Sequence, residues 1–257
     1  MPDVNSPAVK ATNATAAAGA PPLARRLLAE AVGTALLVAV VVGSGIMAQR
    51  LSPNDVGLQL LENSTATVFG LGVLILLFGP VSGAHFNPVV SAADWFLGRR
   101  AGAGLSGSDV AAYTGAQVAG AILGAVLANA MYSLTPVQVS AHHRATSGVL
   151  LGEVVATAGL IALIFALARS GRAPLSAAAV GAYIGSAYWF TSSTSFANPA
   201  VTVGRIFSDT FAGIAPASVP AFVVAQLVGA ALGAVLIRAL YPDIAGAADD
   251  VVIAHPH

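Results

Sequence analysis

Two Asn-Pro pairs, at matching points of two similar halves of the chain, constrain the fold most strongly. They lie in segments 83–89 and 195–201. Proline fixes its own φ angle and lacks an N–H, so it suits the first turn of a helix, and a preceding asparagine can cap that helix. Each segment therefore predicts a loop that turns into a short half-helix, starting at Pro88 or Pro199.

The composition predicts an all-α membrane protein. Of the 257 residues, 56% are hydrophobic and only 9% are charged, and the mean hydropathy is +0.81. This is too little charge to cover a soluble globule of this size, so most of the chain is expected to lie in the lipid bilayer. The net charge of zero gives no electrostatic reason for a nucleic-acid partner, and the absence of cysteine excludes thiolate metal sites. We expect neither a cofactor nor a bound metal.

Six apolar runs are long enough to cross a bilayer, given about 20 residues per helix. They lie at about 27–48, 64–79, 109–132, 149–168, 174–191 and 217–240. The second and fifth are short, and an Asn-Pro segment directly follows each, as expected where a broken helix returns into the protein. We expect residues 1–24 to form a flexible tail, 25–241 a single membrane domain and 242–257 a polar tail.

Positive charge predicts the orientation. Eight of the eleven Lys and Arg residues fall on the side of the two termini: Lys10, Arg25, Arg26, Arg99, Arg100, Arg169, Arg172 and Arg238. Only Arg50, Arg144 and Arg205 fall on the other side. This excess predicts a multi-pass protein of the cell membrane (plasma or inner membrane) with both termini in the cytoplasm.

An internal repeat extends beyond the Asn-Pro pairs. Segment 28–34 recurs as 151–157, and 116–132 recurs as 225–241, so repeat one covers about 25–132 and repeat two about 149–241. Three spans per half require opposite topologies, which is the inverted-repeat arrangement. The 116–132 and 225–241 segments each carry small residues four positions apart, which predicts close helix packing: Gly120, Gly124, Gly229 and Gly233.

Both repeats also carry a glutamate inside a predicted span, Glu30 and Glu153. A carboxylate within the membrane is costly and needs partners, so it is either a transport or proton group or a structural clamp on backbone N–H groups. The matched positions favour the clamp, which would hold the loops before the half-helices.

The glutamate helix, the motif Ser-Gly-Ala-His-Phe-Asn-Pro at 82–88 and the second Asn-Pro-Ala together resemble the major intrinsic protein family, the aquaporins and aquaglyceroporins. The resemblance covers about 25–241 and implies six transmembrane helices, two re-entrant half-helices, one pore per subunit and a homotetramer. It also implies passive flow of water or small uncharged solutes, with protons excluded. The residues implied at the central constriction are Asn87, Asn198, His85, Pro88 and Pro199.

The expected selectivity filter departs from the usual family pattern. Val201 stands where most members carry a filter arginine. Counting from the motifs without gaps places the other filter residues at Thr67, Ser186 and Ser195. These four residues predict a wide, uncharged filter that passes glycerol-like solutes larger than water.

Segment 190–205 looks like a bacterial subgroup with valine at this filter position, some members of which conduct arsenicals. Passage of metalloids or methylated arsenicals is therefore a specific hypothesis. Arg205, one helical turn beyond Val201, either supplies a cation at the outer vestibule that attracts anionic or polar solutes, or pairs with Asp209.

Other functions remain open. A water-selective aquaporin and an ion-coupled secondary transporter fit the inverted repeat, although coupling normally needs buried titratable groups at the substrate site. A closed pore with a junctional role is a further alternative. His142 and His143 leave a pH-sensing role open for the loop that contains them. No nucleophile with a base, and no metal site, indicates an enzyme.

Overall fold

The computed structural model describes residues 21–99 and 102–241, and within them all regular structure is helical. The helices are α1 Leu23–Leu51, α2 Val56–Ser82, α3 Pro88–Gly98, α4 Gly107–Met131, α5 Ser147–Arg169, α6 Ser176–Phe190, α7 Pro199–Gly204 and α8 Val219–Leu240. Short 3-10 turns at Ala173–Leu175, Arg205–Phe207 and Pro216–Ser218 precede α6, follow α7 and precede α8.

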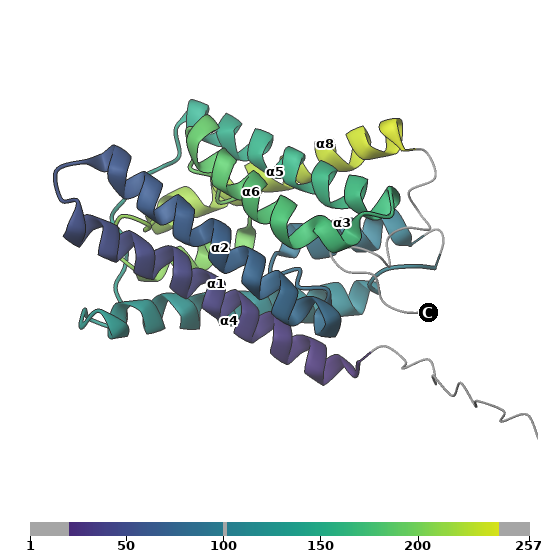
Figure 1. The fold of residues 1–257 in the computed structure, drawn as a ribbon, viewed down its shortest axis with the longest axis horizontal. Helices are drawn as coiled ribbons and strands as arrows, with labels where there is room; N and C mark the ends of the chain where they lie inside the picture. The colour runs from purple at the N-terminus through teal and green to yellow at the C-terminus, as the bar shows by residue number, and fades with distance from the viewer. Residues whose placement is uncertain (1–20, 100–101, 242–257) are drawn as a thin grey trace, which may run out of the picture.

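The long helices form one bundle along the long axis of the molecule (Figure 1). Helices α1, α2 and α4 lie in the lower part of this view, and α5, α6 and α8 in the upper part. The start of α1 and the end of α8 lie at the same end, which we call the terminal end; the opposite end, which holds the α1–α2 loop, is the distal end.

Five helices have the length and hydropathy to cross a membrane, among the residues that the structure describes: α1, α2, α4, α5 and α8 with its preceding turn. The fifth predicted span, 174–191, corresponds to a 3-10 turn followed by α6, which has 15 residues. That length is short of the roughly 20 residues of a full crossing, as predicted for a helix that leads into a re-entrant loop.

The prediction of a short second span is wrong. Helix α2 has 27 residues and begins at Val56, where the Asp55 side chain accepts a hydrogen bond from Leu58 N at 2.9 Å. Hydropathy misses the first two turns because their polar side chains turn inward. Gln59 Nε2 donates to Ser52 O at 2.7 Å, and Asn63 Nδ2 donates to Val41 O at 2.8 Å.

Glycines bring helix pairs into backbone contact in both halves. A Cβ atom built on Gly120 or Gly124 of α4 would overlap a carbonyl oxygen of α1, and Gly229 and Gly233 of α8 face α5 in the same way. The close packing predicted from the four-residue spacing is confirmed. This packing joins α1 to α4 in the first half and α5 to α8 in the second half.

The two predicted tails fall mostly outside the described residues, which exclude 1–20 and 242–257. Helix α1 begins at Leu23, so the last two residues of the expected N-terminal tail are helical.

Replacing Gly124 with leucine should destabilise the fold. The larger side chain would be forced against the Ala35 carbonyl, and overpacking of this kind costs about 1–3 kcal/mol or more. The expected result is a lower melting temperature of the detergent-solubilised protein, followed by size-exclusion chromatography after heating. Gly115→Leu in the same helix is the matched control, because a Cβ atom there meets nothing within 4 Å. An equal melting temperature for the two variants would contradict the packing.

Candidate functional site

Each Asn-Pro pair starts a short helix in the interior of the bundle. The Asn87 side-chain oxygen accepts a hydrogen bond from Val89 N at 3.1 Å, with proline at the first position of α3. Asn198 accepts two such bonds at the start of α7, also followed by proline. The predicted asparagine caps and proline starts are confirmed in both halves.

Glu30 of α1 holds the loop before α3. Its Oε1 accepts from His85 N at 3.0 Å and from Ser82 Oγ at 2.6 Å, and its Oε2 accepts from Phe86 N at 2.7 Å and from Gln117 Nε2 at 2.7 Å. Glu30 is fully buried, so these four donors replace water around the carboxylate. Hydrogen bonds to a charged acceptor are the strong ones, which makes this loop rigid.

Glu153 of α5 does the same for the loop before α7. Its Oε1 accepts from Phe196 N at 2.8 Å, and its Oε2 accepts from Ala197 N at 2.9 Å and from Gln226 Nε2 at 2.6 Å. Glu153 is also fully buried. The two halves therefore build the same arrangement from a glutamate, a glutamine and two loop N–H groups.

The loops that the glutamates hold have an unusual backbone. Ala84 and Phe86 have φ angles of 48° and 49°, and Ser195 and Ala197 at the matched positions both have 48°. None of these is glycine, and the left-handed region costs an ordinary residue about 1–2 kcal/mol. The buried carboxylates offset that cost, because only this conformation turns successive N–H groups toward them.

The two asparagine amides tie the halves together. Asn87 Nδ2 donates to Ala197 O at 2.8 Å, and Asn198 Nδ2 donates to Phe86 O at 2.7 Å. Each asparagine thus caps its own half-helix through its oxygen and holds the opposite loop through its nitrogen. An amide NH₂ group has two N–H donors, so one on each side chain remains for a solute.

A cavity between the halves reaches both asparagines. Its volume of about 70 Å³ is room for several water molecules. The loops contribute their polar groups to its wall, whereas the long helices contribute aliphatic side chains, four from each half: Leu37, Val41, Leu71, Ile75, Leu160, Ile164, Val180 and Ile184. The wall therefore has a polar and an apolar part.

The structure does not bring Ser186 to this cavity. Ser186 is exposed, and its hydroxyl donates to Tyr183 O at 2.8 Å. Tyr188 lines the cavity instead, because α6 presents every fourth residue to it, and Ser186 is half a turn away. The ungapped count fails because it sets the register of α6 by counting back from the second Asn-Pro motif, without knowing where α6 ends. Continuing the apolar spacing of Val180 and Ile184 by four would have found Tyr188.

The remaining predicted filter residues do line the cavity. Thr67, Ser195 and Val201 are all part of its wall, and each is at most 5% exposed. Thr67 Oγ1 lies 3.3 Å from the Tyr188 hydroxyl, so the two side chains form a hydrogen bond between α2 and α6. His85 also lines the cavity, and its Nδ1 lies 3.0 Å from Ser91 Oγ.

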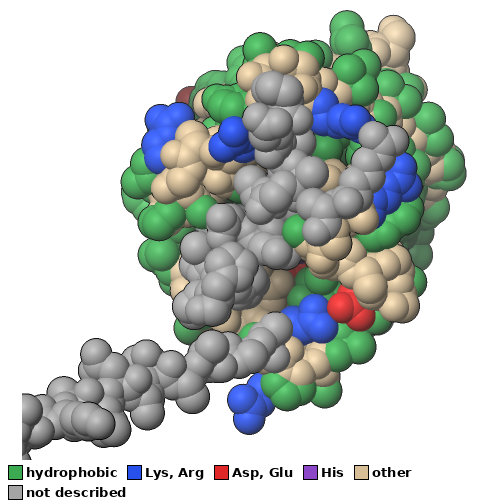
Figure 2. Space-filling view, turned by 90° about the vertical axis from the view of Figure 1, so that its right-hand side faces the viewer, with side chains coloured by type: hydrophobic (Ala, Val, Ile, Leu, Met, Phe, Trp, Pro, Cys, Tyr) green, Lys and Arg blue, Asp and Glu red, His purple; other side chains and the backbone are tan. Residues whose placement is uncertain are grey.

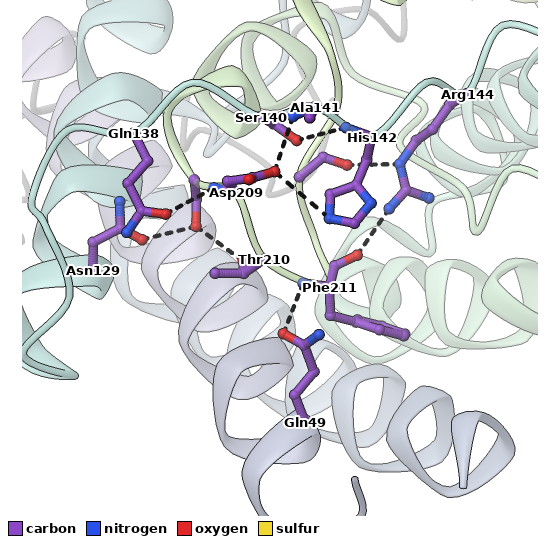
Figure 3. A network of polar contacts seen from close by, with 12 residues as sticks. Gln49, Asn129, Gln138, Ser140, Ala141, His142, Arg144, Asp209, Thr210 and Phe211 are labelled. Carbon is purple, nitrogen blue, oxygen red and sulfur yellow. Dashed lines mark hydrogen bonds and ion pairs between the residues drawn. The ribbon is translucent and has the colours of Figure 1, made fainter. Parts of the chain in front are cut away.

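Of the two alternatives expected for Arg205, the structure contradicts the pair with Asp209. Arg205 is 3% exposed and lines the cavity, so it adds a positive charge to the wall beyond the four predicted, uncharged filter residues. It does not pair with Asp209: its Nε donates to the Ala212 carbonyl. Asp209 instead accepts from Ala141 N at 2.9 Å and lies 3.7 Å from His142 Nε2 (Figure 3).

Arg144, in the loop before α5, is a cation that the sequence reasoning did not assign to the site. Its Nε donates to Gly213 O at 2.7 Å and its guanidinium also donates to Phe211 O at 2.8 Å (Figure 3). These bonds hold the α4–α5 loop against the loop that follows α7. Burial lowers the pKa of Arg144 from its ordinary value, while Tyr188 and Glu153 act in the opposite direction. No local motif marks this residue, since its neighbours come from loops far along the chain.

Comparisons with known proteins agree with this architecture. The sequence profile of the major intrinsic protein family matches residues 18–194. The chain is 50% identical over 216 residues to aquaglyceroporin AqpS of Rhizobium meliloti, covering 84% of this chain and 90% of that protein. It is 36% identical to a glycerol uptake facilitator protein of Pseudomonas aeruginosa, covering 91% and 96%. The aquaglyceroporin structure from Plasmodium falciparum superposes with a TM-score of 0.58 at 21% identity, covering 89% of this chain and 99% of that one.

Replacing Glu30 with glutamine should loosen the first loop. The amide places an NH₂ group where an oxygen now accepts two hydrogen bonds, and each bond lost to a charged acceptor costs about 1.5–3 kcal/mol. We expect a clear drop in melting temperature in detergent. Glu62→Gln is the matched control, because Glu62 accepts one hydrogen bond, from Ser52 Oγ at 2.9 Å. A Glu30→Gln variant as stable as the control would show that the carboxylate does not hold the loop.

Proposed function

The chain belongs to the major intrinsic protein family and is a passive channel of the membrane, not an enzyme, and we propose that it conducts water and small uncharged solutes of the glycerol type. The observation that carries this proposal is that the cavity wall has a polar part and an apolar part. Aliphatic side chains from four helices face it together with the amides of Asn87 and Asn198. A polyol can place its C–H groups against the aliphatic side chains and its hydroxyl groups at the asparagine amides.

The same geometry supports selection against cations, including protons. The Asn87 and Asn198 nitrogens are donors, so a water molecule between them is oriented with its oxygen toward them. Arg205 adds a fixed positive charge to the same cavity. Electrostatic barriers and oriented donors of this kind exclude protons from water-filled pores.

Val201 supports solutes larger than water. It is a small apolar side chain in the cavity wall, and it leaves space that an arginine there would fill. The relatives named as an aquaglyceroporin and a glycerol uptake facilitator favour this choice over a water-selective channel. Metalloids and methylated arsenicals are a finer part of the proposal, to be tested as separate solutes.

The terminal end is proposed to face the cytoplasm. Six described arginines surround it, Arg25, Arg26, Arg99, Arg169, Arg172 and Arg238. Figure 2 looks at this end and shows arginine side chains spaced around it. The distal end has three described arginines, Arg50, Arg144 and Arg205. This excess of positive charge at the terminal end is typical of a protein with cytoplasmic termini.

A homotetramer is also proposed. Helix α2 carries a row of exposed apolar side chains, among them Phe69, Val73, Leu76 and Leu77, that either lipid or a second subunit must cover. Native mass spectrometry of the detergent-solubilised protein tests the assembly, and a monomer would contradict it.

Stopped-flow light scattering of proteoliposomes tests the solute. Water, glycerol and arsenous acid are compared against empty vesicles, with Val201→Arg measured alongside. Because the arginine fills the cavity wall, it should reduce glycerol flux by about tenfold, or about 1.4 kcal/mol of barrier, and leave water flux within about twofold. Val201→Ala is the control that keeps a small apolar side chain. Water flux without glycerol flux in the wild-type protein would make the channel water-selective.

A reporter fusion tests the orientation. Green fluorescent protein joined to the C-terminus should fluoresce in cells, because it folds in the cytoplasm, and alkaline phosphatase at the same point should be inactive. The reverse pattern would contradict cytoplasmic termini.

A further inference from the structure

Two guanidinium groups lie against one aromatic ring, that of Phe196, at the distal end of the cavity. We call this part of the channel the distal mouth. The guanidinium carbon of Arg205 lies 3.4 Å from the centre of the Phe196 ring, and that of Arg144 lies 5.5 Å from it. Two cations this close repel each other, and burying them is costly unless an anion pairs with them. Among the described residues, no carboxylate oxygen lies within 4.0 Å of either guanidinium.

The nearby acidic side chains do not balance these charges. Glu153 interacts electrostatically with both arginines, but its oxygens already accept three hydrogen bonds from N–H donors. Asp209 faces Ala141 and His142 instead. The other two described carboxylates at the distal end, Asp55 and Glu62, bond to Leu58 N and Ser52 Oγ. Two positive charges and one negative charge leave the mouth with a single excess positive charge.

Polar groups without a protein partner face the same space. Arg205 uses only its Nε in a hydrogen bond, to the Ala212 carbonyl, so its two terminal nitrogens have no protein acceptor among the described residues. Ser195 is 4% exposed and lines the same cavity as Arg205, and its Oγ has no hydrogen-bond partner. Tyr188 lines the cavity too and interacts electrostatically with both arginines, but its hydroxyl already bonds to Thr67 Oγ1. A buried hydroxyl without a partner and guanidinium nitrogens without an acceptor, in the wall of one cavity, indicate a site for a ligand or ordered water.

We infer that the distal mouth binds one small monovalent oxyanion, through the terminal nitrogens of Arg205 and the hydroxyl of Ser195, with Arg144 supplying the second positive charge. The planar guanidinium fork matches two oxygens of a carboxylate, sulfonate or similar group. One excess positive charge matches a monovalent anion. The effect on flux rests on the proposed channel function, whereas the binding itself does not.

The consequence for the channel is competition at its entrance. An oxyanion held at the distal mouth occupies the space that a neutral solute must cross, and the apolar walls beyond it oppose its further passage as a charged species. Because a channel must release what it binds, we expect a weak site, with a Kd on the order of 10 mM.

Methanesulfonate is the probe, because it remains a monovalent oxyanion at any working pH and does not cross lipid as a neutral acid. Glycerol flux into proteoliposomes is measured with sodium methanesulfonate on both sides, against the same concentration of sodium chloride. At about ten times the expected Kd, methanesulfonate should slow glycerol flux by about tenfold relative to chloride. The melting temperature in detergent is measured in the same two salts, and methanesulfonate should raise it by about 3–5 °C more.

Three variants locate the site. Ser195→Ala should weaken both effects by at least about threefold; it is compatible with the backbone, because Ala84 has the same φ of 48° at the matched position of the first loop. Arg205→Lys keeps the charge but loses the fork, so methanesulfonate should lose its advantage over chloride. Arg50→Gln is the matched control: Arg50 is exposed at the distal end and donates to Tyr132 O at 2.7 Å, outside the cavity wall, so both effects should persist.

The outcomes separate this inference from the proposed function. If the wild-type protein conducts glycerol but methanesulfonate and chloride act equally on flux and on melting temperature, the oxyanion site is wrong and the channel function stands. If glycerol does not pass, the proposed solute is wrong, and the melting temperatures of the wild type and Ser195→Ala still decide whether the site exists. An effect that Ser195→Ala retains in full would also overturn it.

Discussion

The channel depends on two buried carboxylates, one in each half. Glu30 and Glu153 each hold two successive loop N–H groups and a glutamine side chain. Without an acceptor these donors would be unsatisfied inside the bundle, and the non-glycine residues at positive φ would relax. Everything nearer the cavity, including the asparagine amides and the start of each half-helix, is positioned by these loops. The two intramembrane acids therefore hold the backbone of the loops that start the half-helices.

The two halves are alike at the centre and differ at the distal mouth. Equivalent glutamates, asparagines and aliphatic side chains line the middle of the cavity. At the distal end only the second half supplies Ser195, Val201 and Arg205. Val201 is apolar, and the positive charge of Arg205 lies one turn farther along, against Phe196. We therefore expect the asymmetric distal mouth to select among solutes, and the symmetric centre to exclude cations, including protons.

The sequence predicted the parts of the fold whose signal is local. Asparagine caps, proline starts and glycine spacing all depend on neighbours within a few positions, and the structure has them where expected. The predictions failed where distant contacts decide. The polar first turns of α2 are stabilised by α1, so hydropathy alone shortened the helix. Tyr188 replaces Ser186 because the end of α6 sets its register, and Arg144 reaches the mouth only through the folded loops.

The reciprocal asparagine contacts have a consequence for how the protein is made. Asn87 donates to Ala197, and Asn198 donates to Phe86, so each half completes the other. On the ribosome, residues up to the end of α4 emerge long before Ala197 exists. During that interval the Asn87 amide lacks the acceptor that it has in the finished fold. The two asparagine contacts can therefore form only after the second half has been made and has packed against the first.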